Sequence, residues 1–191
     1  NIYASEYPAS ASKIATALMT FKYAKFDDTV TISYNASHVT EPGARLCGFK
    51  EGDKISVKDL LYGMMVYSGN DAAVALAEYI SGSETDFAAE MNQEMVAIGA
   101  SGTHFVNASG LPDENHYSCA EDLAKIMRAG LKNARFRKVL ETVSYTIPAT
   151  NLSAARPLHT HVPLLAKESS LYYEGCIGGK TGFSTEAQNC L

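Results

Sequence analysis

The sequence lacks the long hydrophobic run that a membrane-spanning helix requires. Such a helix takes about 18 or more consecutive apolar residues, and no run among these 191 residues reaches that length. A signal peptide is missing too, and the chain opens in NIYASEYP without a Met. This opening is typical of a mature or trimmed segment, so the missing leader indicates no particular compartment.

An excess of positive charge is also absent. The 16 Lys and Arg residues are outnumbered by 21 Asp and Glu residues, which gives a formal net charge of −5, whereas nucleic-acid-binding domains usually carry a basic stripe. Nucleic acid is therefore not an expected partner. Internal repeats, low-complexity tracts and linkers are missing as well. With 46% hydrophobic and 19% charged residues, the chain is predicted to form one globular domain over residues 1–191.

Pairs of cysteines in CxxC spacing do not occur. Four cysteines permit three disulfide connectivities, and the sequence does not choose among them; buried free thiols are the favoured interpretation in a domain of this size. The four are Cys47, Cys119, Cys176 and Cys190. His159 and His161 have a metal-like spacing, but a zinc site needs further ligands, so no metal is predicted.

Apolar periodicity and capping signals predict a mainly helical middle with strands towards the two ends of the chain. Ser56 to Asp59 and Ser118 to Glu121 resemble capping boxes, which mark helix starts. Stretches rich in Gly, Pro and Asn predict loops at 41–52 and 107–116. The predicted helices are 9–21, 56–66, 71–80, 83–98, 118–130 and 136–140, and the predicted strands are 29–34, 143–147 and 172–182.

Ser10-Ala11-Ser12-Lys13 is the first stretch that could carry chemistry. Residues three apart share a helix face, so Ser10 and Lys13 can approach each other, whereas Ser12 points elsewhere. A serine hydroxyl needs a base to accept its proton, and lysine can be that base only if burial or a neighbouring cation lowers its pKa. Backbone N–H groups at the helix start can face a developing negative charge. Alone, however, the stretch is more typical of a solvated helix cap.

Ser68-Gly69-Asn70 and Lys180-Thr181-Gly182 are two further short motifs. The first lies at a break between helices and could present a hydroxyl and an amide to a cleft, although by itself it is typical of a helix N-cap. The second could offer a cation and a hydroxyl to a carboxylate from a strand edge. GKT also ends the phosphate-binding loop, but that pattern needs glycine where Glu174 stands and a long helix afterwards, so a phosphate loop is not predicted.

The three motifs in this order are similar to the trio of penicillin-binding proteins and β-lactamases. The chain resembles the D-alanyl-D-alanine carboxypeptidases, the low-molecular-mass penicillin-binding serine peptidases of bacterial cell walls, over nearly its whole length. YPASASKIATALM resembles their nucleophile helix, YSGNDAAVALAE their second motif and GKTGFSTEA their third. FVNASGLPDENHYSCAEDLAKIM resembles a loop-and-helix block that is characteristic of the carboxypeptidases rather than of β-lactamases.

The resemblance implies an α+β fold of the β-lactamase/transpeptidase type, in which a helical cluster lies beside an antiparallel sheet. Family members begin with one or two strands before the nucleophile helix and continue past Lys-Thr-Gly with further strands and a helix. Compared with them, this sequence starts where the first strands end and stops at EAQNCL. We therefore expect an incomplete sheet, and membrane contact only through a segment outside this sequence.

The resemblance also implies roles in catalysis. Ser10 attacks the carbonyl between the two D-alanines and forms an acyl-enzyme, and Lys13 is the base for that step. Ser68 relays a proton to the leaving D-alanine. The backbone N–H groups of Ser10 and Phe183 form the oxyanion hole, and water then hydrolyses the acyl-enzyme.

Substrate binding is implied for a second set of residues. Asn70 holds the substrate amide, Lys180 and Thr181 bind the terminal carboxylate, and Gly182 and Phe183 continue the binding strand. The implied partners are peptidoglycan pentapeptide stems and β-lactam antibiotics, with no cofactor and no metal. The implied location is the extracytoplasmic cell envelope of a bacterium.

Two other functions stay open from the sequence. A serine β-lactamase resembling class A would carry Asp between Ser and Asn and an E-x-x-L-N loop, whereas this chain has Gly69 and no E-x-x-L-N. A non-catalytic binding or sensory module could keep the fold, but it has little reason to retain all six chemical groups of the three motifs. His116 and Asp113 are expected to serve structure, and Arg135 and Arg137 to be solvated or ion-paired.

Overall fold

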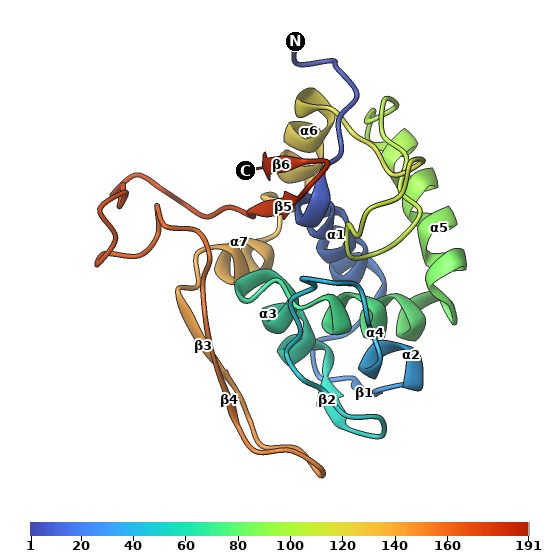
Figure 1. The fold of residues 1–191 in the computed structure, drawn as a ribbon, viewed down its shortest axis with the longest axis vertical. Coiled ribbons are helices and arrows are strands. Elements are labelled where there is room, and N and C mark those ends of the chain that lie inside the picture. Colours follow the sequence, from blue (N-terminus) through green and yellow to red (C-terminus); the bar gives the residue numbers. More distant parts are fainter. Residues whose placement is uncertain (191) are drawn as a thin grey trace.

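Helices gathered around one buried helix, α1, make up most of the molecule, and paired strands lie at its periphery (Figure 1). The computed structural model describes residues 1–190; Leu191, the last residue of the predicted domain, lies outside them. The helices are η1 (Ala9–Ser12), α1 (Lys13–Tyr23), α2 (Tyr34–Ser37), α3 (Val57–Val66), α4 (Asn70–Ser81), α5 (Glu84–Ala97), α6 (Ala120–Gly130) and α7 (Ala134–Leu140). The strands are β1 (Thr29–Thr31), β2 (Lys54–Ser56), β3 (Ser144–Ile147), β4 (Arg156–His159), β5 (Gly182–Ser184) and β6 (Gln188–Cys190).

Helix α1 is largely buried, and its small buried residues, among them Ala15 and Ala17, let neighbouring helices approach. It contacts α3, α4, α5, α6 and α7. Its two buried threonines donate to backbone carbonyls, Thr20 to Thr16 at 2.8 Å and Thr16 to Ala108 at 2.6 Å, so both hydroxyls have an acceptor. The second of these bonds ties α1 to the loop after α5.

Capping residues determine where helices α3, α4 and α5 begin or end. Ser56 and Ser83 each accept a hydrogen bond from the backbone N–H three residues on, at 3.0 Å, and so start α3 and α5. Gly82, at φ 81°, ends α4 in the left-handed conformation that glycine adopts without strain. The predicted starts of these helices are confirmed. Helix α4 buries its alanines against α3 and α5, and a short turn at residues 67–70 connects it to α3.

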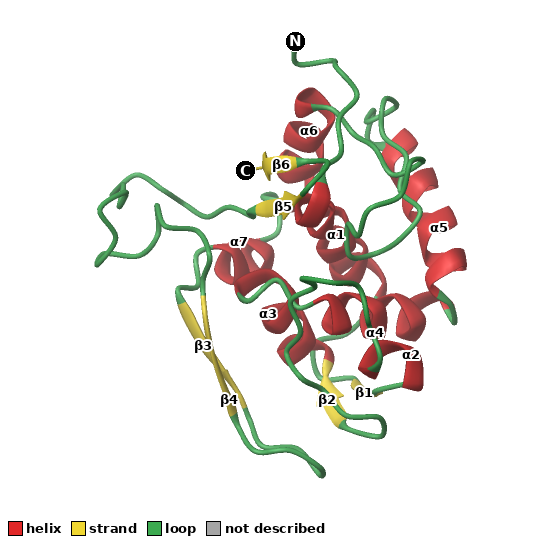
Figure 2. Ribbon diagram, viewed as in Figure 1, coloured by secondary structure: helices red, strands yellow, loops and turns green. Residues whose placement is uncertain are grey.

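The strands of residues 1–190 form three separate antiparallel pairs, drawn in yellow in Figure 2. Val30 lies opposite Ile55 in β1–β2, Tyr145 opposite Leu158 in β3–β4, and Phe183 opposite Asn189 in β5–β6. The β5–β6 pair packs against η1. Helices beside antiparallel strands confirm the predicted α+β class, and the third pair brings the end of the chain to its beginning.

One predicted helix cap and one predicted strand are wrong. Ser118 does not cap α6: its backbone pairs with Glu6 in an isolated bridge, and its hydroxyl lies 2.8 Å from that of Thr103. Helix α6 therefore starts at Ala120, without a side-chain cap. The strand predicted over 172–182 begins only at Gly182. Tyr173 and Ile177 are 65% and 64% exposed. Residues of these types favour strands when they pack on a half-buried sheet surface, and here they lack such a surface.

Candidate active site

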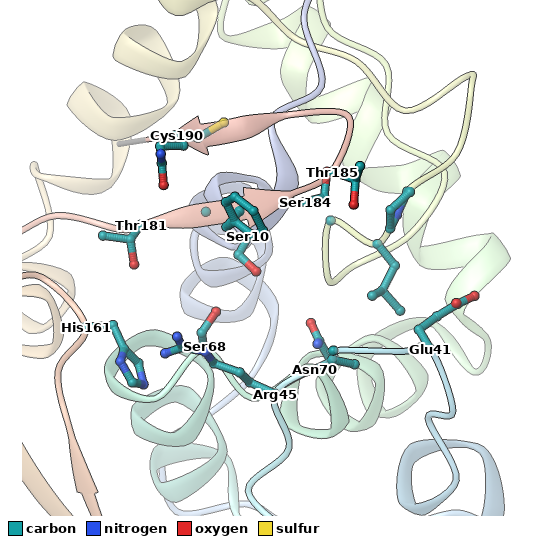
Figure 3. A pocket seen from close by; sticks show the side chains of 18 of the residues that line it. Ser10, Glu41, Arg45, Ser68, Asn70, His161, Thr181, Ser184, Thr185 and Cys190 are labelled. Carbon is teal, nitrogen blue, oxygen red and sulfur yellow. The ribbon is translucent and has the colours of Figure 1, made fainter.

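A cleft of ≈ 840 Å³ brings together residues from both ends and the middle of the chain. Ser10 comes from η1, Ser68 and Asn70 from the connection between α3 and α4, and Thr181 from the segment before β5 (Figure 3). Loops at 41–45 and 110–112 close two further sides. The structure thus places side chains of all three sequence motifs around one space.

Lys13 is fully buried beneath Ser10 and reaches three acceptors. Its ammonium lies 2.9 Å from the Ser10 hydroxyl and 2.6 Å from Asn70 Oδ1, and it also donates to the Ser109 carbonyl. Burial, together with the nearby charge of Lys180, lowers the pKa of Lys13 well below its usual range. These are the conditions under which a lysine can accept a proton from serine. The one-turn spacing of Ser10 and Lys13 predicted this contact.

The backbone at Ser10 is held in an unusual conformation. Ala9 has φ 45°, in the left-handed region that residues with a side chain rarely adopt. Gly110 lies against it so closely that a Cβ atom there would stand 1.9 Å from the Ala9 carbonyl oxygen. On the other side, a Cβ at Gly182 would lie 3.0 Å from the Ser10 nitrogen. Two glycines therefore clamp the turn that carries Ser10.

Ser68 and Lys180 form the second serine–lysine pair of the cleft. The Lys180 ammonium donates to the Ser68 hydroxyl at 2.9 Å, and burial, followed by the charge of Arg45, lowers the pKa of Lys180 to about 7. Ser68 has φ 69°, a strained conformation of the kind that concentrates at functional sites. Its turn is held by backbone bonds from Gly69 to Gly63 and from Asn70 to Arg45.

No space exists for a side chain at Gly69. A Cβ atom there would lie 2.5 Å from Cys47 Sγ and 2.9 Å from Asp71 Oδ1. Asp71 itself is buried and accepts hydrogen bonds from the backbone N–H groups of Cys47 and Gly48, both at 2.9 Å. One carboxylate thus fixes the loop at 41–49 next to the start of α4.

The third motif lines the other wall of the cleft. Thr181, Gly182 and Phe183 all border it, and the Phe183 side chain is 68% exposed. Lys180 is buried behind them. The predicted site residues are therefore brought together in the structure, while their roles in binding and catalysis stay predictions.

Sequence reasoning missed three groups at this site. The Ser109 carbonyl accepts a hydrogen bond from Lys13. Every residue has a backbone carbonyl, so the residue type at position 109 does not indicate this contact. Arg45 extends towards Ser68 in Figure 3, and His161 borders the same space. Burial and the charges of Arg45 and Lys180 lower the pKa of His161 to about 4. In the sequence, Arg45 and His161 differ from other residues only by lying outside the predicted helices and strands, and many residues share that property.

The residues expected to have ordinary roles lie elsewhere. His116 is buried beneath η1, and Arg135 stacks over the Phe26 ring at 5.2 Å. The four cysteines are free thiols, two of them buried, Cys47 and Cys119. Across residues 1–190, no three His, Cys, Asp or Glu side chains are grouped so that they could hold a metal ion. No helix of that part of the chain has the length and apolar character needed to cross a membrane.

The family model and the curated relatives that match this chain carry the same description. The family model described as D-alanyl-D-alanine carboxypeptidase matches residues 1–191. The chain is 34% identical over 189 residues to the D-alanyl-D-alanine carboxypeptidase DacF of Bacillus subtilis, which covers 96% of this chain and 46% of that protein. It is 40% identical over 147 residues to the D-alanyl-D-alanine carboxypeptidase of Streptomyces sp. strain K15, covering 73% and 50%. The chain therefore spans about half the length of these curated relatives.

Solved structures agree with the sequence relatives. The Streptomyces K15 DD-transpeptidase superposes with a TM-score of 0.88 at 33% identity, over 98% of this chain and 75% of that one. The D-alanyl-D-alanine carboxypeptidase of Mycobacterium tuberculosis H37Rv gives 0.86 at 30% identity, over 97% and 67%. The predicted transpeptidase-like fold is confirmed.

Proposed function

The chain belongs to the D-alanyl-D-alanine carboxypeptidase family, and from this membership we propose that it acts as a serine D,D-carboxypeptidase. Its substrate is the peptidoglycan stem peptide, from which it removes the terminal D-alanine in the extracytoplasmic cell envelope. The observation that carries the proposal is the buried Lys13 ammonium 2.9 Å from the Ser10 hydroxyl. A lysine in that place, with a lowered pKa, is a base for a serine nucleophile.

Acylation begins when the Ser10 oxygen attacks the carbonyl carbon between the two D-alanines. Neutral Lys13 accepts the hydroxyl proton as the new C–O bond forms. The carbonyl oxygen becomes an oxyanion, which the backbone N–H groups of Ser10 and Phe183 stabilise by roughly 3 kcal/mol per donor. The C–N bond then breaks, the proton passes through Ser68 to the leaving nitrogen, and D-alanine departs. Ser10 is left as an ester of the shortened stem.

Lys180 and Thr181 provide the groups for the terminal carboxylate. Lys180 offers a cation next to Ser68, and Thr181 borders the cleft with a hydroxyl. A charge-assisted bond to a carboxylate is stronger than a neutral one, and this contact orients the scissile amide over Ser10. Asn70 is held by Lys13 through its oxygen, so its amide nitrogen remains available to a substrate carbonyl.

Deacylation repeats the chemistry with water. A water molecule attacks the ester carbonyl, Lys13 accepts one of its protons, and the ester C–O bond breaks with return of a proton to the Ser10 oxygen. A β-lactam ring mimics the scissile amide, and its opening leaves Ser10 acylated. Since the leaving group stays tethered to the acyl group, the adduct is long-lived.

The test is mass spectrometry of the intact protein after incubation with benzylpenicillin. We expect one adduct with the mass of the drug, located on Ser10, present in wild type and in the exposed-serine control Ser101→Ala, and absent in Ser10→Ala. Release of D-alanine from a tripeptide ending in D-Ala-D-Ala would establish the hydrolysis. A folded wild-type protein that stays unmodified would overturn the mechanism and favour a non-catalytic module, and rapid turnover of penicillin would favour a β-lactamase.

A further inference from the structure

A buried pair of polar side chains, Ser12 and His116, lies directly beneath the nucleophile turn and takes no part in the chemistry above. Both are almost inaccessible to solvent, with 0% and 2% exposure. Their contact joins the end of η1 to the loop after α5: the Ser12 oxygen is 2.7 Å from His116 Nε2. Polar groups buried this deeply are retained where each hydrogen bond is satisfied.

The direction of each hydrogen bond follows from its partners. The backbone N–H of Val106 donates to His116 Nδ1 at 3.2 Å, so Nδ1 carries the lone pair and the ring proton sits on Nε2. Nε2–H then donates to the Ser12 oxygen, and the Ser12 hydroxyl donates to the Ala9 carbonyl at 2.9 Å. Burial lowers the pKa of His116 to about 4, which keeps the ring neutral at pH 7. The chain of donors therefore runs from Val106 to Ala9 without a gap.

The series of hydrogen bonds ends at the Ala9 carbonyl, which lies next to the nucleophile Ser10. It belongs to the same planar trans peptide group as the Ser10 N–H, and in such a group the C=O and N–H point in opposite directions. Anchoring the oxygen from below therefore aims the N–H of Ser10 away from Ser12. A hydrogen bond to a carbonyl also polarises the peptide, which makes its N–H a better donor.

The conformation of Ala9 explains why such an anchor is needed. A residue with a side chain in the left-handed region is disfavoured by about 1–3 kcal/mol, and Ala9 has φ 45°. Without the bond from Ser12, the peptide between Ala9 and Ser10 could rotate to relieve that strain. Gly110 blocks one side of the carbonyl through its close approach, but contact alone does not fix the direction of the N–H.

We propose that Ser12 and His116 are positioning residues that orient and polarise the Ser10 N–H as a donor of the oxyanion hole. The inference rests on the proposed function, because the oxyanion arises only if Ser10 is acylated. It assigns a purpose to Ser12, the serine next to Lys13 that cannot itself reach the base.

The test separates binding from acylation. The dissociation constant of benzylpenicillin and the first-order acylation rate constant are measured by stopped-flow mixing for wild type, Ser12→Ala, His116→Leu, His116→Gln and the control Ser101→Ala. Outright removal of an oxyanion donor slows acyl transfer by about 10²–10³. Misorientation should do less, so we expect a roughly 10-fold slower acylation in Ser12→Ala and His116→Leu with an unchanged dissociation constant.

Two further readouts distinguish positioning from general loosening. Glutamine retains a side-chain N–H donor, so His116→Gln should recover most of the rate that His116→Leu loses. Affinity for a D-alanine-derived boronic acid, whose tetrahedral adduct places an oxygen in the oxyanion hole, should fall by the same factor as the acylation rate. Thermal melting identifies any variant that fails to fold, and whichever of Ser12→Ala and His116→Leu is folded then carries the test.

Several results would overturn the inference. These are wild-type acylation rates in folded Ser12→Ala and His116→Leu, a loss confined to the dissociation constant, or a boronate affinity that does not follow the rate. If wild type itself is not acylated, the proposed function fails and the inference with it. If wild type and Ser101→Ala are acylated, and folded Ser12→Ala and His116→Leu are acylated at the same rate, the inference alone fails.

Discussion

Lys180 donates to the hydroxyl of Ser68 at 2.9 Å across 112 residues of sequence. Lys13 makes the equivalent contact with Ser10 at the same distance. Both lysines are buried, and the charge of Lys180 contributes to the lowered pKa of Lys13. Two ammonium groups in one cleft disfavour each other's charge. The roles that we propose, a neutral Lys13 as base and a charged Lys180 as carboxylate receptor, are therefore compatible only within a limited range of pH.

The pH dependence of acylation follows from this pair. Lys180 has a pKa of about 7, so it is charged below pH 7 and loses its charge as the pH rises. We expect the second-order rate constant for benzylpenicillin to fall above pH 7, because the carboxylate of the drug loses its cation. Arginine stays charged at these pH values, so the rate constant of Lys180→Arg should not fall above pH 7. It should still increase from low pH towards neutral pH, because Lys13 must lose its proton before it can act as a base. The same fall in Lys180→Arg would contradict the assignment.

Gly110→Ala should be strongly destabilising. It combines φ +83° with a Cβ position 1.9 Å from the Ala9 oxygen, and backbone strain together with a core clash typically exceeds about 3 kcal/mol. Gly43→Ala is the matched control, since Gly43 has φ +80° but nothing within 4 Å of its Cβ position. Its cost should stay at about 1–2 kcal/mol, the penalty of the left-handed conformation alone. Urea denaturation measures both free energies of unfolding, and equal losses would show that the contact with Ala9 is unimportant.

Asp71→Asn should loosen the loop that carries Arg45. The Asp71 carboxylate accepts from the N–H groups of Cys47, Gly48 and Ala72 at 2.9 Å, and an amide nitrogen cannot accept. Leaving a buried N–H unsatisfied typically costs about 1–3 kcal/mol. We expect that loss in urea denaturation together with slower penicillin acylation. The exposed Asp27→Asn should change neither quantity, and an unaffected Asp71→Asn would show that the loop has another anchor.

Gly69 and Cys47 should be energetically coupled. The Cβ of Gly69→Ala would lie 2.5 Å from Cys47 Sγ, so this variant should be destabilised by about 1–3 kcal/mol, as expected of an overpacked site. Cys47→Ala removes the sulfur, so the double variant should recover part of the loss, while the Cβ position 2.9 Å from Asp71 Oδ1 retains the rest. A double-mutant cycle in urea gives the coupling. Additive effects would mean that the turn shifts away from Cys47 instead of compressing against it.

Local spacing made part of this site predictable. Ser10 and Lys13 are one helical turn apart, so their contact follows from helix geometry and needs no knowledge of the rest of the fold. The helix starts at Ser56 and Ser83 follow for the same reason, because a cap involves only neighbours along the chain. The order of the three motifs then supplied the family, and with it the expectation that Ser68 and Lys180 face the same cleft.

Contacts made by the backbone, or between residues far apart in the sequence, could not be predicted from the sequence. The carbonyl of Ser109, which holds Lys13, could belong to any residue type. Ser118 has the sequence pattern of a cap, but its pairing with Glu6, 112 positions earlier in the chain, turns its hydroxyl to Thr103. Asn70 was expected to hold substrate, and nothing in its neighbourhood along the chain indicated that its oxygen bonds to Lys13, 57 residues away. Such contacts exist only once the helices have packed.

The walls of the cleft come from η1, the α3–α4 connection, the loop at 110–112 and β5, which are far apart along the chain. A partly folded intermediate in which the ends of the chain have not met cannot present Ser10, Lys13 and Lys180 together. If Ser10 is acylated as we propose, covalent labelling by a β-lactam would therefore count natively folded molecules. A fluorescent penicillin could then report refolding yield or aggregation directly in a crude mixture, without purification and without a spectroscopic signal from the protein.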